Sequence, residues 1–253
     1  MASPAIELKN VTVKFGTMPL LENISFAVAP GQSLVLIGPS GQGKSVLLKV
    51  MAGLLHPSEG NVYIEGNDLY ATHGREREAL AKKMGMLFQK NALFDSLTCA
   101  ENVAFPLREV QNAREDAVHQ AIDRYLQAVG LSHARDLFPD EISGGMQKRL
   151  GIARAIAMKP EIVLYDDPTA GLDPITSRMI VQLILDLKNE SGSTVVSVTN
   201  DMNRANQLAD IIGMVVDREV IWCGSPLETQ KSKDPRVIQF IGGLLQGPLT
   251  VQA

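Results

Sequence analysis

A glycine-rich stretch near the start of the chain carries the residue types that bind phosphate. It fits the pattern G-x-x-x-x-G-K-[ST]. Its residues are Gly38, Pro39, Ser40, Gly41, Gln42, Gly43, Lys44 and Ser45. Because glycines lack a Cβ, backbone N–H groups can converge there on phosphate oxygens. The lysine can reach the β- and γ-phosphates, and the final serine hydroxyl can ligate Mg²⁺. The stretch therefore predicts a site for a nucleoside triphosphate.

The segments on either side of this stretch have the structure that such a site needs. Residues 33–37 form a short apolar run typical of a buried strand, and residues 46–52 are mostly good helix formers. A strand, a glycine turn and a helix start would aim the positive end of the helix at the phosphates. The flanking sequence thus supports the phosphate-binding interpretation.

A second glycine pair stands before another helical run. Ser143 can cap a helix that continues to about residue 156, and Gly144 and Gly145 keep the backbone open at its positive end. One monomer rarely needs two anion sites of this kind. A symmetric dimer does need them, if each chain offers its second site to the nucleotide of its partner.

The composition limits the class of protein. The chain has 253 residues, 45% of them hydrophobic and 21% charged, which suits one sizeable α/β domain or a core with an inserted subdomain. Its net charge of −4 gives no basic surface for nucleic acid. Cys99 and Cys223 have neither metal-ligand nor disulfide spacing. We expect no signal peptide and no membrane span of ~20 apolar residues, so a membrane role would depend on a partner.

Strand and helix patterns divide the chain. Residues 6–8 and 11–13 predict two short strands, and strand character recurs up to Gln89. From about 90 to 160 the pattern is helical, with Asn112 as the expected cap of one helix. Asp173 and Pro174 predict the start of a helix that runs to about Lys188. The tail from Gly242 to Ala253 lacks an amphipathic pattern, and we expect it to be mobile unless a partner holds it.

Together these motifs resemble the ATP-binding cassette (ABC) family over essentially the whole chain. Residues 38–45 resemble the Walker A motif, residues 162–166 resemble Walker B, and Ser143-Gly144-Gly145 resemble the family signature. Three further positions match: Gln89 the Q-loop, Gly171-Leu172-Asp173 the D-loop, and Phe15 the aromatic residue that stacks on adenine.

The resemblance implies an α/β fold with a P-loop NTPase (RecA-like) core, an antiparallel β subdomain and an inserted α-helical subdomain. The core would comprise residues 1–89 and 161–241, the helical insertion residues 90–160, and the tail residues 242–253.

The resemblance also implies ATP and Mg²⁺ as ligands and ATP hydrolysis as the reaction. Ser45, Gln89 and Asp166 would hold the metal, and Asp167, Asn200 and Gln89 would act in hydrolysis. The residues implied in nucleotide binding are Phe15, Gly38, Pro39, Ser40, Gly41, Gln42, Gly43, Lys44, Ser45, Ser143, Gly144, Gly145 and Asp173.

Two of these positions depart from the family pattern. Asp167 stands where the family has the glutamate that polarises water, and Asn200 stands where it has a histidine. The aspartate carboxylate sits one methylene further back, and a ~1 Å displacement can cost about a hundredfold in rate. One hypothesis is a slow, gated ATPase that mainly clamps. The other is that an adjusted backbone lets both residues do the usual work, which we favour because a homodimer would have no intact site.

A closer resemblance is to the Mla-type ATPases of phospholipid transport in bacterial envelopes. It rests on residues 91–94, 101–108, 143–146 and 234–240. It implies an ATP-dependent dimer with a second copy, bound to a transmembrane permease subunit on the cytoplasmic face of the inner membrane. The alternatives are a soluble ABC-type clamp or sensor with weak hydrolysis, and an ABC ATPase for another cargo.

The segment from Leu93 to Phe105 has two interpretations. It follows Gln89 and mixes apolar residues with few charges, which suits a groove that receives a short helix of the membrane subunit. Packing within the helical insertion explains the same pattern equally well. The permease is therefore expected to dock near Gln89–Phe105, with packing as the open alternative.

Overall fold

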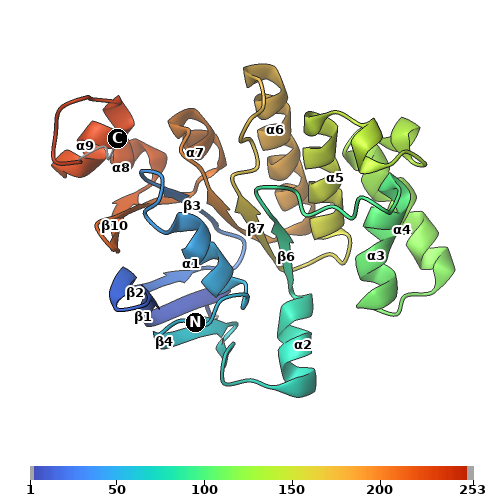
Figure 1. Cartoon of the computed structure of the whole chain (residues 1–253), viewed down its shortest axis with the longest axis horizontal. Helices are drawn as coiled ribbons and strands as arrows, with labels where there is room; N and C mark the ends of the chain where they lie inside the picture. Colours follow the sequence, from blue (N-terminus) through green and yellow to red (C-terminus); the bar gives the residue numbers. More distant parts are fainter. Residues whose placement is uncertain (1–2, 250–253) are drawn as a thin grey trace. The chain divides into compact units, whose positions relative to one another are not determined.

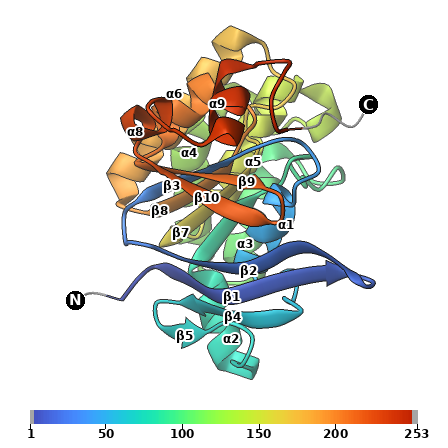
Figure 2. The same ribbon diagram turned by 90° about the vertical axis from the view of Figure 1, so that its left-hand side faces the viewer.

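The N-terminal strands form an antiparallel sheet. β1 (Ile6–Phe15) pairs with β2 (Met18–Val28) on one side and with β4 (Glu59–Ile64) on the other, and β5 (Asn67–Asp68) follows β4 at the edge (Figure 2). The prediction of two short strands in residues 6–13 was wrong. β1 is continuous, and its register against β2 shifts between Leu8 and Val11. An irregularity of this kind interrupts the apolar alternation without ending the strand.

The computed structural model describes residues 3–249. It divides into two compact units, which are the described parts of Met1–Gly74 with Thr194–Ala253, and Arg75–Ser193. The boundaries of the core and the helical insertion that the sequence suggested stay a prediction. Within the described residues no helix has the length and apolar character needed to cross a membrane.

A parallel arrangement carries the phosphate loop in the first unit. β3 (Ser33–Ile37) lies between β8 (Thr194–Val198) and β9 (Ile211–Val216), and β10 (Glu219–Gly224) is antiparallel to β9. Every residue of β3 and β8 is buried, as expected for strands covered on both faces. The helices of this unit are α1 (Lys44–Met51), α7 (Met202–Leu208), α8 (Pro226–Gln230) and α9 (Pro235–Gly242) (Figure 1).

The second unit combines a parallel strand pair with helices. β6 (Met84–Leu87) pairs with β7 (Ile162–Asp166). The helices are α2 (Gly74–Lys82), α3 (Cys99–Glu109), α4 (Glu115–Ala128), α5 (Gly144–Ile156) and α6 (Pro174–Ser191), with 3₁₀ turns at Ser132–Ala134 and Pro139–Glu141.

The helix starts test the capping predictions. Asp173 caps α6 and Pro174 is its first residue, as predicted, and the helix continues to Ser191 because Gly192 supplies the left-handed end. The prediction that Asn112 caps α4 was wrong. Arg114 occupies that position, and Asn112 instead has a left-handed backbone with a φ of 50°.

The last described residues fold back on α9. The buried side chain of Gln239 donates to the carbonyl of Leu249 at 3.1 Å and accepts from the Leu249 N–H at 2.7 Å. The expectation that the tail is mobile unless a partner holds it stays a prediction. In the described part, the side-chain amide of Gln239 bonds both backbone groups of Leu249, as a neighbouring strand would. Residues 250–253 of the predicted tail lie outside the described residues.

Candidate nucleotide-binding site

The phosphate loop connects β3 to α1 and depends on glycine conformations. Gly38 has a φ of 133°, and a Cβ there would lie 2.3 Å from the carbonyl oxygen of Val215. That oxygen belongs to a backbone and has no room to move away. Gly41 and Gly43 also have positive φ values, 81° and 96°. The loop therefore bends as it does because these positions lack side chains, and the strand–turn–helix prediction is confirmed.

The charged side chain of the loop points into the loop itself. Lys44 is buried, and its Nζ donates to the carbonyls of Gly38 at 2.6 Å and Pro39 at 2.7 Å. The ammonium thus stands among backbone groups at the start of α1. An incoming phosphate would meet both this charge and the positive end of the helix.

Asn200 lies at the phosphate loop. It stands between the end of β8 and Asp201, the cap of α7, and its Nδ2 donates to the Ser40 hydroxyl at 3.3 Å. The loop is also held from the other side, where Gln42 Oε1 accepts from the Asp217 N–H at 3.2 Å. The side-chain amide of Asn200 is therefore placed to give a neutral hydrogen bond next to the phosphates.

Phe15 closes β1 and is 59% exposed. It pairs with Met18 across the turn to β2. Its ring therefore presents an open face in the first unit, which is the property needed for stacking on a base.

The carboxylates of the second unit stand at the end of β7. Asp166 ends the strand and is buried, and Asp167 comes next with a left-handed φ of 48°. Asp and Asn are enriched several-fold among the non-glycine residues in this region of the backbone. The turn therefore suits the shorter side chain that the sequence has at this position.

A buried lysine near these carboxylates was missed by the sequence analysis. Lys148 of α5 is 5% exposed, and its Nζ donates to the carbonyl of Gln89 at 2.6 Å. Burial lowers the pKa of this ammonium, and the charges of Asp167 and Asp166 oppose that shift. The available signal was that Lys148 occurs among the buried positions of α5 at helical spacing.

The signature residues and the D-loop meet within the second unit. Ser143 caps α5 and accepts from the Met146 N–H at 3.3 Å. A Cβ on Gly145 would lie 3.0 Å from Cγ2 of Thr176 in α6. Asp173, the cap of α6, accepts from Thr176 Oγ1 at 2.5 Å, and hydrogen bonds from Thr176 hold its pKa below the ordinary value. The starts of α5 and α6 therefore lie together.

Each of the three predicted magnesium residues, taken by itself, offers an oxygen donor that suits the ion. Ser45 offers a hydroxyl at the start of α1, Asp166 offers a buried carboxylate, and Gln89 offers an exposed amide oxygen. Hard oxygen donors of this kind suit Mg²⁺, which usually takes only one or two carboxylates and completes its shell with waters and phosphates. Residues 3–249 hold no group of three or more His, Cys, Asp or Glu side chains placed to bind a metal.

The segment after Gln89 is held by side chains. Asn102 of α3 is fully buried; its Oδ1 accepts from the Phe94 N–H at 3.0 Å and its Nδ2 donates to the Leu97 carbonyl at 2.9 Å. Phe94 packs on Phe105 with 4.4 Å between ring centroids, and the Arg154 guanidinium lies 4.4 Å from the Phe94 ring. Phe94 thus packs within the unit and also keeps part of its ring exposed.

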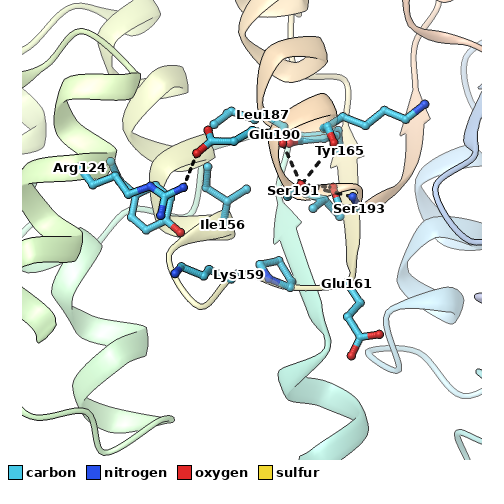
Figure 3. Close-up of a pocket in the computed structure, with 13 residues that line it drawn as sticks. Arg124, Ile156, Lys159, Glu161, Tyr165, Leu187, Glu190, Ser191 and Ser193 are labelled. Atoms are coloured by element: carbon cyan, nitrogen blue, oxygen red, sulfur yellow. Dashed lines mark hydrogen bonds and ion pairs between the residues drawn. The ribbon is translucent and has the colours of Figure 1, made fainter.

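A cavity of about 240 Å³ lies elsewhere in the second unit (Figure 3). Its lining includes Tyr165 of β7 and the Arg124–Glu190 ion pair between α4 and α6. None of the predicted nucleotide or metal residues lines it.

Comparison with protein families gives a match over more than half of the chain. The model described as "ABC transporter" matches residues 21–170, which hold both the phosphate loop and the carboxylates at the end of β7.

Two named relatives align along nearly all of the chain. The intermembrane phospholipid transport system ATP-binding protein MlaF of Haemophilus influenzae is 38% identical over 96% of this chain and 92% of its own length. The probable ribonucleotide transport ATP-binding protein mkl of Mycobacterium leprae is 39% identical over 97% of this chain and 71% of its own length.

Solved structures agree with the fold. The ATP-binding cassette MJ0796, a dimer in a post-hydrolysis state bound to ADP and Pi, has a TM-score of 0.78 at 35% identity, covering 85% of this chain and 96% of that chain. CbiO1 from Clostridium perfringens, part of the ABC transporter complex cbiONQ, has a TM-score of 0.82 at 25% identity, covering 96% of this chain and 99% of that chain. The predicted fold class is confirmed. The chain belongs to the ABC transporter family, in which it is an ATP-binding subunit that hydrolyses ATP.

Proposed function

We propose that this ATPase energises phospholipid transport through a separate membrane subunit. The observation that carries the proposal is the alignment with the Haemophilus influenzae phospholipid transport protein over almost the full length of both chains. The relative named for ribonucleotide transport is as similar, but this chain spans a smaller share of it. Ribonucleotide transport is therefore the second candidate.

We assign the steps of hydrolysis to the predicted residues. The phosphate loop and Lys44 bind the phosphates, and Phe15 stacks on the base. Ser45, Asp166 and Gln89 would hold Mg²⁺, which supplies charge neutralisation for the phosphoryl oxygens when bound. Asp167 accepts the proton of the attacking water. Asn200 donates a neutral hydrogen bond to the γ-phosphate, which is supported by its contact with Ser40.

The partner that completes the site is proposed to be a second copy of the chain. In the second unit, Ile175 and Met179 are 75% and 53% exposed, and they stand one turn apart on α6 next to Asp173. The signature serine that caps α5 is exposed as well. ATP-driven dimerisation would cover this apolar pair and bring the signature of one copy to the nucleotide of the other.

The membrane subunit is proposed to dock near Gln89–Phe105, on the cytoplasmic face of the inner membrane. Phe94 is partly exposed, and its ring is held in place by Phe105 and Arg154, so it offers an ordered apolar surface. Such a surface suits the apolar face of a short helix.

The first experiment is the ATPase rate of the purified chain against its own concentration, with Lys44→Ala as the control. A composite site predicts a rate per chain that rises with concentration and disappears in the control. A rate per chain that does not depend on concentration would contradict the dimer.

The cargo needs a second experiment. The tagged chain is purified with its membrane subunit, reconstituted in vesicles that contain a fluorescent phospholipid, and mixed with acceptor vesicles. We expect transfer that needs ATP and is lost in Lys44→Ala. ATP turnover without lipid transfer, together with ATP-dependent movement of a radiolabelled ribonucleotide, would favour the second candidate.

A further inference from the structure

We propose that Lys148 is a positioning residue that fastens the backbone at Gln89 to α5, the helix that begins with the signature residues. The proposal rests on the proposed function, because that function gives Gln89 and Ser143 their roles in hydrolysis. It adds a device that makes these two motifs of one unit move together.

The contact between Lys148 and Gln89 is a hydrogen bond from a buried, charged donor. Lys148 donates to the Gln89 carbonyl at 2.6 Å and is almost fully buried, whereas the side chain of Gln89 is exposed. The ammonium therefore holds the main chain beneath Gln89 and leaves its amide available to a ligand. A charge-assisted bond is shorter and stronger than a neutral one, and burial strengthens it further.

The backbone that follows Gln89 needs such support. Asn91 and Ala92 are consecutive non-glycine residues in the left-handed region, with φ values of 62° and 51°. Conformations of this kind persist only where the surroundings hold them. Lys148 bonds the carbonyl of Gln89, which is separated from this pair by one residue, and Arg154 Nη1 of the same helix bonds the carbonyl of Ala92.

The helix that supplies both cations is itself packed closely on β6, the strand before Gln89 (Figure 1). A Cβ on Gly151 would lie 2.6 Å from Cδ1 of Leu87, and a Cβ on Gly85 would lie 2.1 Å from the carbonyl oxygen of Ala155. Lys148, Gly151 and Arg154 follow one another at three-residue steps, so they occupy adjoining places on one side of α5. We therefore expect α5 and residues 87–92 to move as one rigid body.

This arrangement has a consequence for catalysis. A displacement at Gln89 is passed to Ser143 through the helix instead of being absorbed by the turn at Asn91 and Ala92. Lys148 thus relates the position of Gln89 to the signature at the start of its own helix.

The test compares Lys148→Met, which removes the donor but keeps the length of the side chain, with Lys148→Arg, which keeps a cationic donor. Lys82→Met, at an exposed position of α2, is the control for loss of one positive charge. Full-length proteins are measured for kcat, for KM of ATP and for hydrogen exchange of the amides at residues 91 and 92. These amides bond the carbonyls of Phe88 and Lys90, so their exchange reports opening of the turn.

We expect Lys148→Met to raise exchange at residues 91 and 92 about tenfold and to lower kcat about ten- to a hundredfold, with KM within about twofold. Lys148→Arg should recover most of both, and Lys82→Met should match the wild type. Unchanged exchange at the turn would overturn the proposal, and so would an equal rise throughout the unit with kcat and KM changing together. If the reconstituted wild type transfers no lipid, the proposed function fails, while the exchange data still decide whether Lys148 fastens the backbone at Gln89.

Discussion

The phosphate loop and the turn after Gln89 are both irregular backbone segments with positive φ values, but they are stabilised in different ways. The loop uses glycines, and at Gly38 a neighbouring backbone excludes any side chain. The turn uses Asn91 and Ala92 and is held in place by cations from α5. Glycine lowers the free-energy cost of a positive φ at its own position. The turn at Asn91 and Ala92 instead depends on Lys148 and Arg154, which are 59 and 62 residues away from the carbonyls they bond. This difference decides what a sequence motif can reveal.

The strongest test of the comparison is a pair of glycine substitutions in the loop. Gly38→Ala should lower the free energy of unfolding by about 3–5 kcal/mol and abolish ATP binding, because its Cβ would overlap the Val215 carbonyl. Gly41→Ala has open space around the new Cβ, so only the left-handed backbone opposes it, at a cost of about 1–2 kcal/mol. Urea unfolding and ATP titration measure both variants. If both variants lose the same free energy of unfolding, glycine is required at position 38 only for its positive φ, and the contact with the Val215 carbonyl does not matter.

These contacts explain which parts of the chain could be predicted. The phosphate loop, the cap at Ser143 and the start of α6 at Asp173 are local patterns, in which spacing and residue type determine the structure within a few positions. Lys148 gave only a faint signal, because its partner at Gln89 is distant in sequence. The contact between Gln239 and Leu249 spans only 10 residues, but no residue pattern marks it, because it depends on how one side-chain amide is oriented. Asn112 misled because Asn suits both a helix cap and a left-handed turn.

The second prediction concerns Asp167, where a left-handed backbone carries a side chain that should do chemistry. Asp167→Asn should lower kcat by at least about a hundredfold with little change in KM, because the amide cannot accept the proton of water. Asp167→Glu should stay within about threefold of the wild type, since the turn already suits the shorter residue. Steady-state kinetics of purified protein measure both.

The alternative hypothesis of a slow clamp makes the opposite prediction for the same variants. A large gain of hydrolysis in Asp167→Glu, or in Asn200→His, would show that the two departures from the family pattern restrain the reaction. The Asn200→His variant also tests the contact with Ser40, because an imidazole can supply a cationic donor there.

The third prediction addresses the loop at residues 94–98, in which the side chain of Asn102 bonds several backbone groups. Asn102→Ala should lower the free energy of unfolding by about 2–4 kcal/mol, because it removes a fully buried amide and leaves the N–H of Phe94 and the carbonyl of Leu97 without that partner. Gln120→Ala, at an exposed position of α4, is the control and should cost less than about 0.5 kcal/mol. A loss for Asn102→Ala as small as for the control would mean that the loop between Phe94 and Thr98 does not depend on this amide.

The smallest effect should come from the cap of α3, at the end of the same segment. Thr98 accepts from the Glu101 N–H at 3.2 Å, and Glu101 accepts from the Thr98 N–H at 2.8 Å. Thr98→Ala should lower the free energy of unfolding by about 1 kcal/mol and leave ATP hydrolysis unchanged, because water can replace one partner of a surface cap. Thr98→Ser keeps the hydroxyl and should stay within about 0.5 kcal/mol of the wild type. If Thr98→Ala lowers the free energy of unfolding as much as Gly38→Ala, the distinction between the two regions fails. Loss of one surface hydroxyl would then destabilise the protein as much as a steric clash in the phosphate loop.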